Sequence, residues 1–219
     1  MPPNITIFDG GHEMSLKIQI APRHKFPSDD LGEMHKLRAK VFKERMGWSV
    51  SLMSGMEIDG YDAIEPLYMM IRETGGILMG CWRILPTVGP YMLKDSFPEL
   101  LHGQPAPEDP KIWELSRFAI ETGSRKNFGF SDVAMESIGQ IIAYGHKMGI
   151  AQYLTVTTTA IERLLKRAGV ITMRFGPPLR IGMENTVALY VDIEATYAVL
   201  FNVKSNKVKS KASMFYTWN

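Results

Sequence analysis

The stretch that decides the fold is Ile112-Trp-Glu-Leu-Ser-Arg-Phe-Ala-Ile120, a mainly apolar run that predicts a buried strand. Downstream, isoleucines at helical spacing predict a helix over Ser131–Met148. Tyr153–Thr157 then predicts a second strand. A strand, a helix and a strand in this order are typical of a mixed sheet with helical crossovers, so we expect an α/β (α+β) protein.

A further helix is predicted upstream of this unit. Apolar residues recur every three to four positions between Leu31 and Met46, which is helical periodicity. The side-chain oxygens of residues 28–30 are candidates for the N-cap, and Gly47 is a candidate stop. Residues 1–27, with several prolines and glycines, are assigned no regular element and are interpreted as an extended or loose lead-in.

Glycine and proline mark turns and loops in the middle of the chain. Leu67–Glu73 and Ile77–Leu85 predict two strands joined as a hairpin across Thr74-Gly75-Gly76. Pro86–Lys111 is long for a connection within a compact domain, and such excursions are often functional.

The last part of the chain predicts a helix and more strands before a basic tail. Thr159-Ala-Ile-Glu162 matches a capping box for a helix that runs to Ala168. Strands are expected near Val170–Phe175 and Val187–Ile193, followed by a helix. We expect a single domain over residues 1–201 and a basic, flexible tail over residues 202–219.

Composition excludes several classes of protein. The chain has 219 residues, 45% of them hydrophobic and 22% charged, which are ordinary globular values. Its single cysteine, Cys81, excludes a disulfide scaffold and a multi-cysteine zinc site; we expect no metal, no cofactor and a cytoplasmic location. The net charge of +2 is too small to indicate a nucleic-acid partner, and no apolar run is long enough for a membrane span.

The first candidate site is a cluster of acidic and aromatic side chains. Carboxylates beside tryptophan and phenylalanine suit a cationic ligand such as an ammonium or a sulfonium, because ring faces add cation–π attraction. The alternative interpretation is a solvated acidic loop beside two core aromatics. The cluster consists of Arg38, Phe42, Trp48, Glu57, Asp59 and Asp62.

The second candidate lies within the strand that decides the fold. Glu114 and Arg117 are ionisable residues in an otherwise apolar run, where burial is costly unless the charges are paired or used. Strict alternation places these two side chains on opposite faces. They can act together only if the strand has a bulge or a splay. A structural ion pair that includes Arg83 is the alternative.

A third candidate is the basic turn Gly123–Ser131, which precedes a predicted helix. Free amides at a helix N-terminus attract anions, and Arg125 and Lys126 add positive charge. A coenzyme A pyrophosphate or a phosphopantetheine would suit such a turn. An exposed surface turn with no ligand is the alternative interpretation.

Eight of these residues, in their order and spacing, resemble the signature of the acyl-homoserine-lactone synthase (autoinducer synthase) family. They are Arg38, Phe42, Trp48, Asp59, Asp62, Arg83, Glu114 and Arg117. The segments Leu31–Ala39, Glu57–Asp62 and Gly89–Lys94 resemble the branch of the family that makes long-chain 3-oxoacyl signals. The longer N-terminus and the lysine-rich tail depart from that pattern.

The resemblance implies a fold and a reaction. The fold is N-acetyltransferase-like, with three layers, helices flanking a mixed sheet and a V-shaped splay between central strands. In the reaction, the amine of S-adenosylmethionine receives the acyl chain that is carried on acyl carrier protein. Lactone closure then releases methylthioadenosine. S-adenosylmethionine is a substrate, not a cofactor. The resemblance assigns its binding to Arg38, Phe42, Trp48, Asp59, Asp62 and Arg83, and catalysis to Glu114, Asp59 and Arg117.

The resemblance also implies where the acyl donor binds. An acyl-chain pocket is expected at Leu115, Phe118, Thr157, Leu164 and Leu165. Thr157 is the candidate that recognises a 3-oxo group, or else an ordinary β-branched strand residue. The acidic carrier is expected to dock on Arg163, Arg167 and Arg180, which are otherwise a solvated basic face. The alternative functions are a coenzyme A-dependent N-acyltransferase of another amine and a non-catalytic carrier-binding module.

Overall fold

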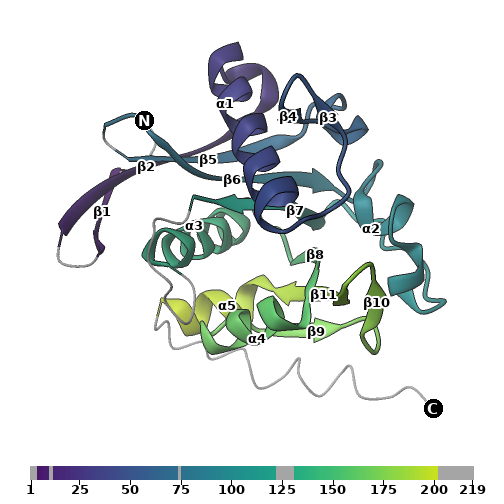
Figure 1. Cartoon of the computed structure of the whole chain (residues 1–219). Helices are drawn as coiled ribbons and strands as arrows, with labels where there is room; N and C mark the ends of the chain where they lie inside the picture. Colours follow the sequence, from purple (N-terminus) through teal and green to yellow (C-terminus); the bar gives the residue numbers. More distant parts are fainter. Residues whose placement is uncertain (1–3, 10–11, 74, 122–130, 202–219) are drawn as a thin grey trace.

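The computed structural model describes residues 4–9, 12–73, 75–121 and 131–201, which form one mixed sheet with helices on both faces (Figure 1). The strand order is β1-β2-β5-β6-β7-β8-β11-β10, and β9 also pairs with β11. The sheet contains β1 (Asn4–Asp9), β2 (His12–Pro22), β5 (Leu67–Glu73), β6 (Leu78–Pro86), β7 (Ile112–Ile120), β8 (Gln152–Thr158), β9 (Thr172–Arg174), β10 (Leu179–Ile181) and β11 (Glu184–Asp192). A separate ribbon is formed by β3 (Leu52–Met53) and β4 (Met56–Glu57).

The helices make the outer layers. They are α1 (Ser28–Ala39), α2 (Met92–Asp95), α3 (Asp132–Met148), α4 (Thr159–Arg167) and α5 (Ile193–Leu200), with a π-helix over Lys40–Arg45 and 3-10 helices over Arg23–Lys25, Gly60–Asp62 and Pro98–Leu101. Alternate residues of the central strands face the two layers. In β5, Met70 packs against the α1 side and Met69 against the α3 side. The three-layer α/β architecture is therefore confirmed.

The sheet opens between β7 and β8. These strands pair in parallel only over Ile112–Glu114, whereas β6 and β7 pair along most of their length. Beyond Glu114, β7 and β8 follow different partners, which produces the V-shaped splay that the sequence led us to expect.

No helix within the described ranges is long and apolar enough to cross a membrane.

Most predicted elements are found close to their predicted bounds. β5 and β7 match residue for residue, and α3 ends at Met148, followed by Gly149 with the positive φ of 70° that is common after a helix. The predicted helix over 31–46 is α1 continued by the π-helix, and Gly47 follows with a φ of 68°.

Three local predictions were wrong. The lead-in before Pro27 forms β1 and β2; Leu16 and Ile18 alternate with polar residues and are buried in the core. The N-cap of α1 is Pro27, so residues 28–30 are its first turn. The cap of α4 is the hydroxyl of Thr158, which accepts from the backbone N–H of Ile161 at 3.3 Å, and this replaces the predicted capping box.

Candidate functional site

A buried ion cluster joins the last turn of α1 to the segment after β4. The guanidinium of Arg38 is fully enclosed. Its Nη1 and Nη2 donate to Asp62 at 2.8 and 2.9 Å, and its Nε donates to Glu57 at 2.5 Å. Burial alone would lower the pKa of Arg38, but the bonds and charges of Asp62 and Glu57 raise it above its ordinary value. This arrangement holds Arg38 as a permanent buried cation.

Asp62 is a fully engaged acceptor. In addition to Arg38, it accepts from Tyr68 Oη at 2.6 Å, from Arg83 Nη1 at 3.1 Å and from the backbone N–H of Asp59 at 2.9 Å. Burial favours its protonated form, yet the hydrogen bonds and charge of Arg38 hold its pKa well below the ordinary range. Asp62 therefore orients other side chains from within the core.

Asp59 is the most accessible carboxylate of the cluster. Its side chain caps the 3-10 helix Gly60–Asp62 by accepting from the backbone N–H of Tyr61 at 3.0 Å. Its Oδ2 accepts from Arg83 Nη2 at 3.1 Å and from Arg117 Nη2 at 2.7 Å. The Asp59 side chain is 17% exposed, against 0% for Glu57 and 3% for Asp62. Among these three carboxylates, Asp59 is the one placed to meet a ligand.

A bulge in β7 brings Arg117 to this cluster. The pairing of β6 with β7 shifts register between Cys81 and Arg83, and Arg117 has a φ of 56°, which is uncommon for a residue other than glycine. Its Nε donates to Glu57 Oε1 at 2.9 Å. The expected bulge is therefore present, together with the splay.

One aromatic ring borders the guanidinium of Arg117, and a second ring stacks on the first. Phe42, in the π-helix, stacks on Trp48 with ring centroids 5.5 Å apart and planes 4° from parallel. The guanidinium of Arg117 lies 5.7 Å from the centroid of Phe42. A π-helix widens one helical turn and is frequent at functional sites. The acidic and aromatic parts of the predicted cluster are thus close together in space.

Glu114 lies at the last position where β7 pairs with β8 and is almost completely buried. Its carboxylate accepts from the backbone N–H groups of Met92 at 2.9 Å and Leu93 at 2.7 Å, at the start of α2. Burial raises the pKa of Glu114, and these amides together with Arg83 and Arg117 oppose that shift only in part. A carboxylate with a raised pKa is a stronger base.

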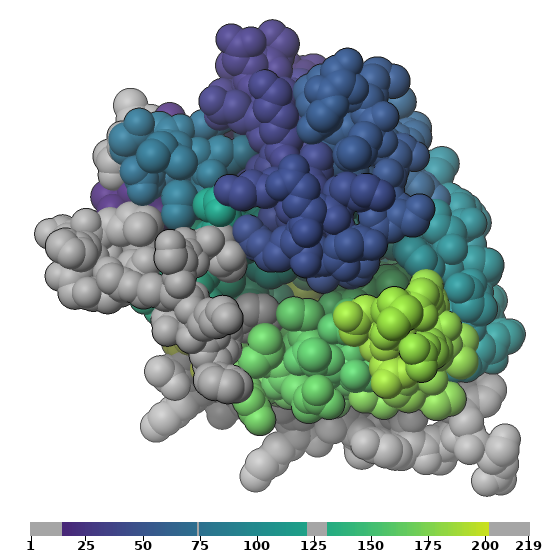
Figure 2. All heavy atoms as spheres, viewed as in Figure 1, coloured from purple at the N-terminus to yellow at the C-terminus, as the bar shows by residue number. Residues whose placement is uncertain are grey.

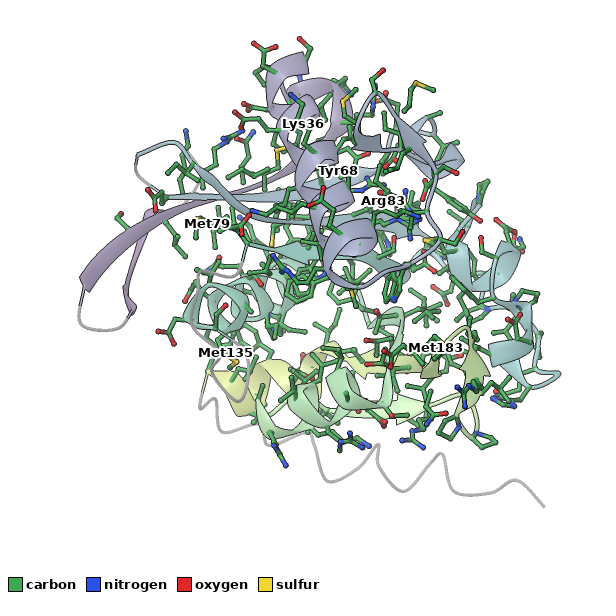
Figure 3. The ribbon with its side chains drawn as sticks, in the orientation of Figure 1. Lys36, Tyr68, Met79, Arg83, Met135 and Met183 are labelled. Atoms are coloured by element: carbon green, nitrogen blue, oxygen red, sulfur yellow. The ribbon has the colours of Figure 1, made fainter. Side chains whose placement is uncertain are left out.

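The site as a whole carries more negative than positive groups. Figure 3 labels Arg83 to the right of α1, near the label of its cross-strand neighbour Tyr68. The cluster contains the carboxylates of Glu57, Asp59, Asp62 and Glu114, and the guanidiniums of Arg38, Arg83 and Arg117. Four carboxylates facing three guanidiniums suit a ligand with positive charge.

Most predicted acyl-pocket residues lie on one face of the opened sheet. Leu115, Phe118 and Leu165 belong to the core cluster on the α3 side. Thr157 shares a face of β8 with Tyr153 of the same cluster, because side chains alternate along a strand. Leu164 is partly buried on α4 and is outside that cluster.

The predicted docking arginines are exposed on neighbouring elements. Arg163 and Arg167 lie on α4, and Arg180 lies on β10. Figure 2 shows this face, green to yellow, across a furrow from the dark blue segment that includes the π-helix. Two nearby cations are already paired, since the buried Glu162 accepts from Lys166 at 2.8 Å and from Arg174 Nη2 at 2.5 Å.

Sequence reasoning missed some members of the site. Tyr68 donates to Asp62, Ser116 accepts from Arg83, and Met92 accepts from both Arg83 and Arg117. The signals for Met92 were its place in the excursion 86–111, which was expected to be functional, and in Gly89–Lys94, one of the segments that carry the resemblance. The basic turn with Arg125 and Lys126, and the tail over 202–219, lie outside the described residues.

Comparison with known proteins identifies the relatives of this chain. Residues 24–199 match the family model described as autoinducer synthase. An acyl-homoserine-lactone synthase of Pseudomonas aeruginosa is 53% identical over 180 residues, which cover 81% of this chain and 90% of the relative.

Two solved structures extend this comparison. The crystal structure of the AHL synthase LasI aligns with a TM-score of 0.79 at 52% identity, covering 85% of this chain and 95% of that one. The CoA-dependent acyl-homoserine lactone synthase BjaI, solved with SAM and isopentyl-CoA, aligns with a TM-score of 0.75 at 27% identity, covering 84% and 87% of the two chains.

Proposed function

The chain belongs to the autoinducer synthase family and is an acyl-homoserine-lactone synthase, an acyltransferase, and we propose that it joins S-adenosylmethionine to a long-chain 3-oxoacyl group on acyl carrier protein. One observation supports the choice of amine substrate. The site has an excess of carboxylates, and the accessible one, Asp59, is linked through Arg117 to the Phe42–Trp48 stack. A ligand that carries both a sulfonium and an ammonium matches these carboxylates and aromatic rings. We place the reaction in the cytoplasm.

We assign the proposed binding roles within the cluster according to how exposed each side chain is. Asp59 binds the positive groups of S-adenosylmethionine, with Phe42 and Trp48 packed beside them. Arg117, which is 14% exposed, meets the substrate carboxylate. The enclosed residues Arg38, Asp62 and Arg83 hold these groups in place.

The proposed chemistry has two steps. The ammonium loses a proton, and the amine attacks the thioester carbonyl; the new C–N bond forms as the C–S bond breaks and the carrier thiol leaves. Glu114, through a water, is the proposed proton acceptor, with Asp59 second; such proton transfer typically contributes about 10²–10⁴-fold. Strand amides near Phe118 are proposed to stabilise the oxyanion. The substrate carboxylate then attacks its own γ-carbon, methylthioadenosine leaves and the lactone closes.

Charge on the α4–β10 face supports a carrier protein as the donor. Arg163, Arg167 and Arg180 are exposed, and an acidic partner would be attracted to them. Coenzyme A remains the competing donor, because BjaI is CoA-dependent. The two donors differ in the protein surface that they need, so they are separable by experiment.

The test compares both donors at equal chain length. Purified protein is given S-adenosylmethionine with 3-oxoacyl-carrier or 3-oxoacyl-CoA, and methylthioadenosine and lactone are quantified by mass spectrometry. We expect Arg163→Glu with Arg167→Glu to lower kcat/KM about tenfold for the carrier only, with a steep loss in salt. Lys36→Glu, at an exposed position of α1, is the control. An equal fall with both donors contradicts carrier docking, and product without methylthioadenosine contradicts lactone synthesis.

The 3-oxo preference is proposed to depend on Thr157. Its hydroxyl can donate to the extra carbonyl, whereas valine has the same shape without that donor. We expect Thr157→Val to lower the ratio of kcat/KM for 3-oxoacyl over unsubstituted donor by about tenfold. Thr155→Val, on the same face of β8, is the control, and an unchanged ratio would assign Thr157 to strand structure alone.

A further inference from the structure

The thioether of Met92 lies between two arginines of the site. Its Sδ is 3.0 Å from Arg83 Nη2 and 3.3 Å from Arg117 Nη1, and the side chain is buried. Sulfur is a weak acceptor, so a buried guanidinium seldom depends on it when an oxygen is available. The same two arginines donate to Asp59, the carboxylate proposed to bind the substrate cation.

Met92 completes the hydrogen bonding of Arg83. The Nε of Arg83 donates to Ser116 at 3.2 Å, its Nη1 donates to Asp59 and Asp62, and its Nη2 donates to Asp59 and Met92. All five N–H groups of this enclosed side chain are then satisfied. Loss of the sulfur would leave one buried donor unpaired, which is costly.

The position of the sulfur is fixed through the backbone. Glu114 accepts from the N–H of Met92 at 2.9 Å and of Leu93 at 2.7 Å, which anchors the start of α2. A continuous set of contacts therefore runs from Glu114 through Met92 to Arg83 and Arg117, and from these to Asp59.

From this geometry we propose that Met92 is a positioning residue, whose thioether holds Arg83 and Arg117 in the orientation that presents Asp59 and Arg117 to S-adenosylmethionine. The inference rests on the proposed function. Leucine fills a similar volume but accepts no hydrogen bond, so Met92→Leu removes the alignment and retains the packing. Glutamine restores an acceptor on an unbranched chain.

The test separates alignment from packing. We expect Met92→Leu to raise KM for S-adenosylmethionine about tenfold and to leave KM for the acyl donor within twofold. Met92→Gln is expected to return KM for S-adenosylmethionine to within threefold of the wild type. Met70→Leu, at a similarly buried core position whose sulfur accepts from neither arginine, is the matched control and should change neither constant.

Each other outcome overturns the inference. Met92 is assigned to packing if Met92→Leu keeps its KM for S-adenosylmethionine within twofold of the wild type, or if its KM rises equally for both substrates. The same assignment follows if the KM of Met92→Gln for S-adenosylmethionine is as high as that of Met92→Leu. Should Met92→Leu fail to fold, as judged by circular dichroism, Met92→Gln decides alone: KM within threefold supports alignment, and a tenfold rise contradicts it. A wild-type protein that releases no methylthioadenosine refutes the proposed function instead.

Discussion

Neutralising Asp62 is the sharpest test of the buried cluster. Asp62→Asn keeps the shape of the side chain but removes its charge, and it replaces one acceptor oxygen with an NH2 donor. The carboxylate accepts two bonds from Arg38 and further bonds from Tyr68, Arg83 and Asp59. Two or three of these donors would then face another donor in a buried site.

The magnitude follows from the burial of Arg38. Removing one partner of a buried ion pair typically costs about 3–5 kcal/mol, because it leaves a buried charge uncompensated. Glu57 still pairs with Arg38 in the variant, so we expect the lower end, about 3 kcal/mol. Since domains are typically stable by roughly 5–15 kcal/mol, this is a large fraction of the total.

The assay is urea unfolding at pH 7 followed by circular dichroism. The midpoint should fall while the slope of the free energy against urea stays unchanged. The control is Asp30→Asn, because Asp30 pairs with Arg72 at 2.9 Å in a partly exposed site, and such pairs contribute about 0–1 kcal/mol. A loss below about 1 kcal/mol for Asp62→Asn would refute the stabilising role of the cluster.

The same pair of proteins gives a pH dependence of known sign. The pKa of Asp62 is held well below its ordinary value of 3.8, so the unfolded chain binds this proton more readily than the folded one. Its contribution to stability is complete above pH 4, and it is lost as the pH falls towards the folded-state pKa. We expect the stability difference between wild type and Asp62→Asn to shrink below pH 4, and a constant difference would contradict this.

Three further outcomes are expected. Gly145→Ala should lower the free energy of unfolding by roughly 1–3 kcal/mol and with it the melting temperature, because the alanine Cβ would stand 2.7 Å from a side-chain carbon of α5. An unchanged melting temperature would contradict this. Thr87→Val should cost about 1–3 kcal/mol in urea unfolding, since its buried hydroxyl is bonded to the backbone of Asp109. Lys166→Ala should reduce kcat/KM for carrier-bound donor less than Arg167→Ala does, because Lys166 is already paired with Glu162.

The elements were predictable from the sequence where hydrophobic periodicity was clear, as in β5, β7 and α3. The hairpin of β1 and β2 was missed, although Leu16 and Ile18 alternate with polar neighbours. Proline and glycine on either side of that alternation concealed it. The conflict between Glu114 and Arg117 in one apolar strand was more informative, because it required the bulge and the splay that the structure contains.

The sequence could not tell which charges neutralise one another. Spacing placed Arg38, Asp59 and Asp62 in one cluster, but only the structure shows that Asp62 is used within the core and that Asp59 retains access to solvent. Met92 carries no charge, so nothing in the pattern marked it as a partner of an arginine. Which carboxylate pairs with which arginine depends on how the strands and helices are aligned in space, and the periodicity of the sequence does not carry that information.

The position of the site follows from the place where the sheet stops pairing. The ladder between β7 and β8 ends at Glu114, and Arg117, three residues further along, adopts an uncommon positive φ. Lost strand pairing and a strained backbone both cost free energy. The ion cluster around Arg117 and Glu57 and the amides bound to Glu114 offset that cost. The groups that stabilise the interrupted strand are thus the same ones that we propose to supply the charge and the base for acylation of an amine.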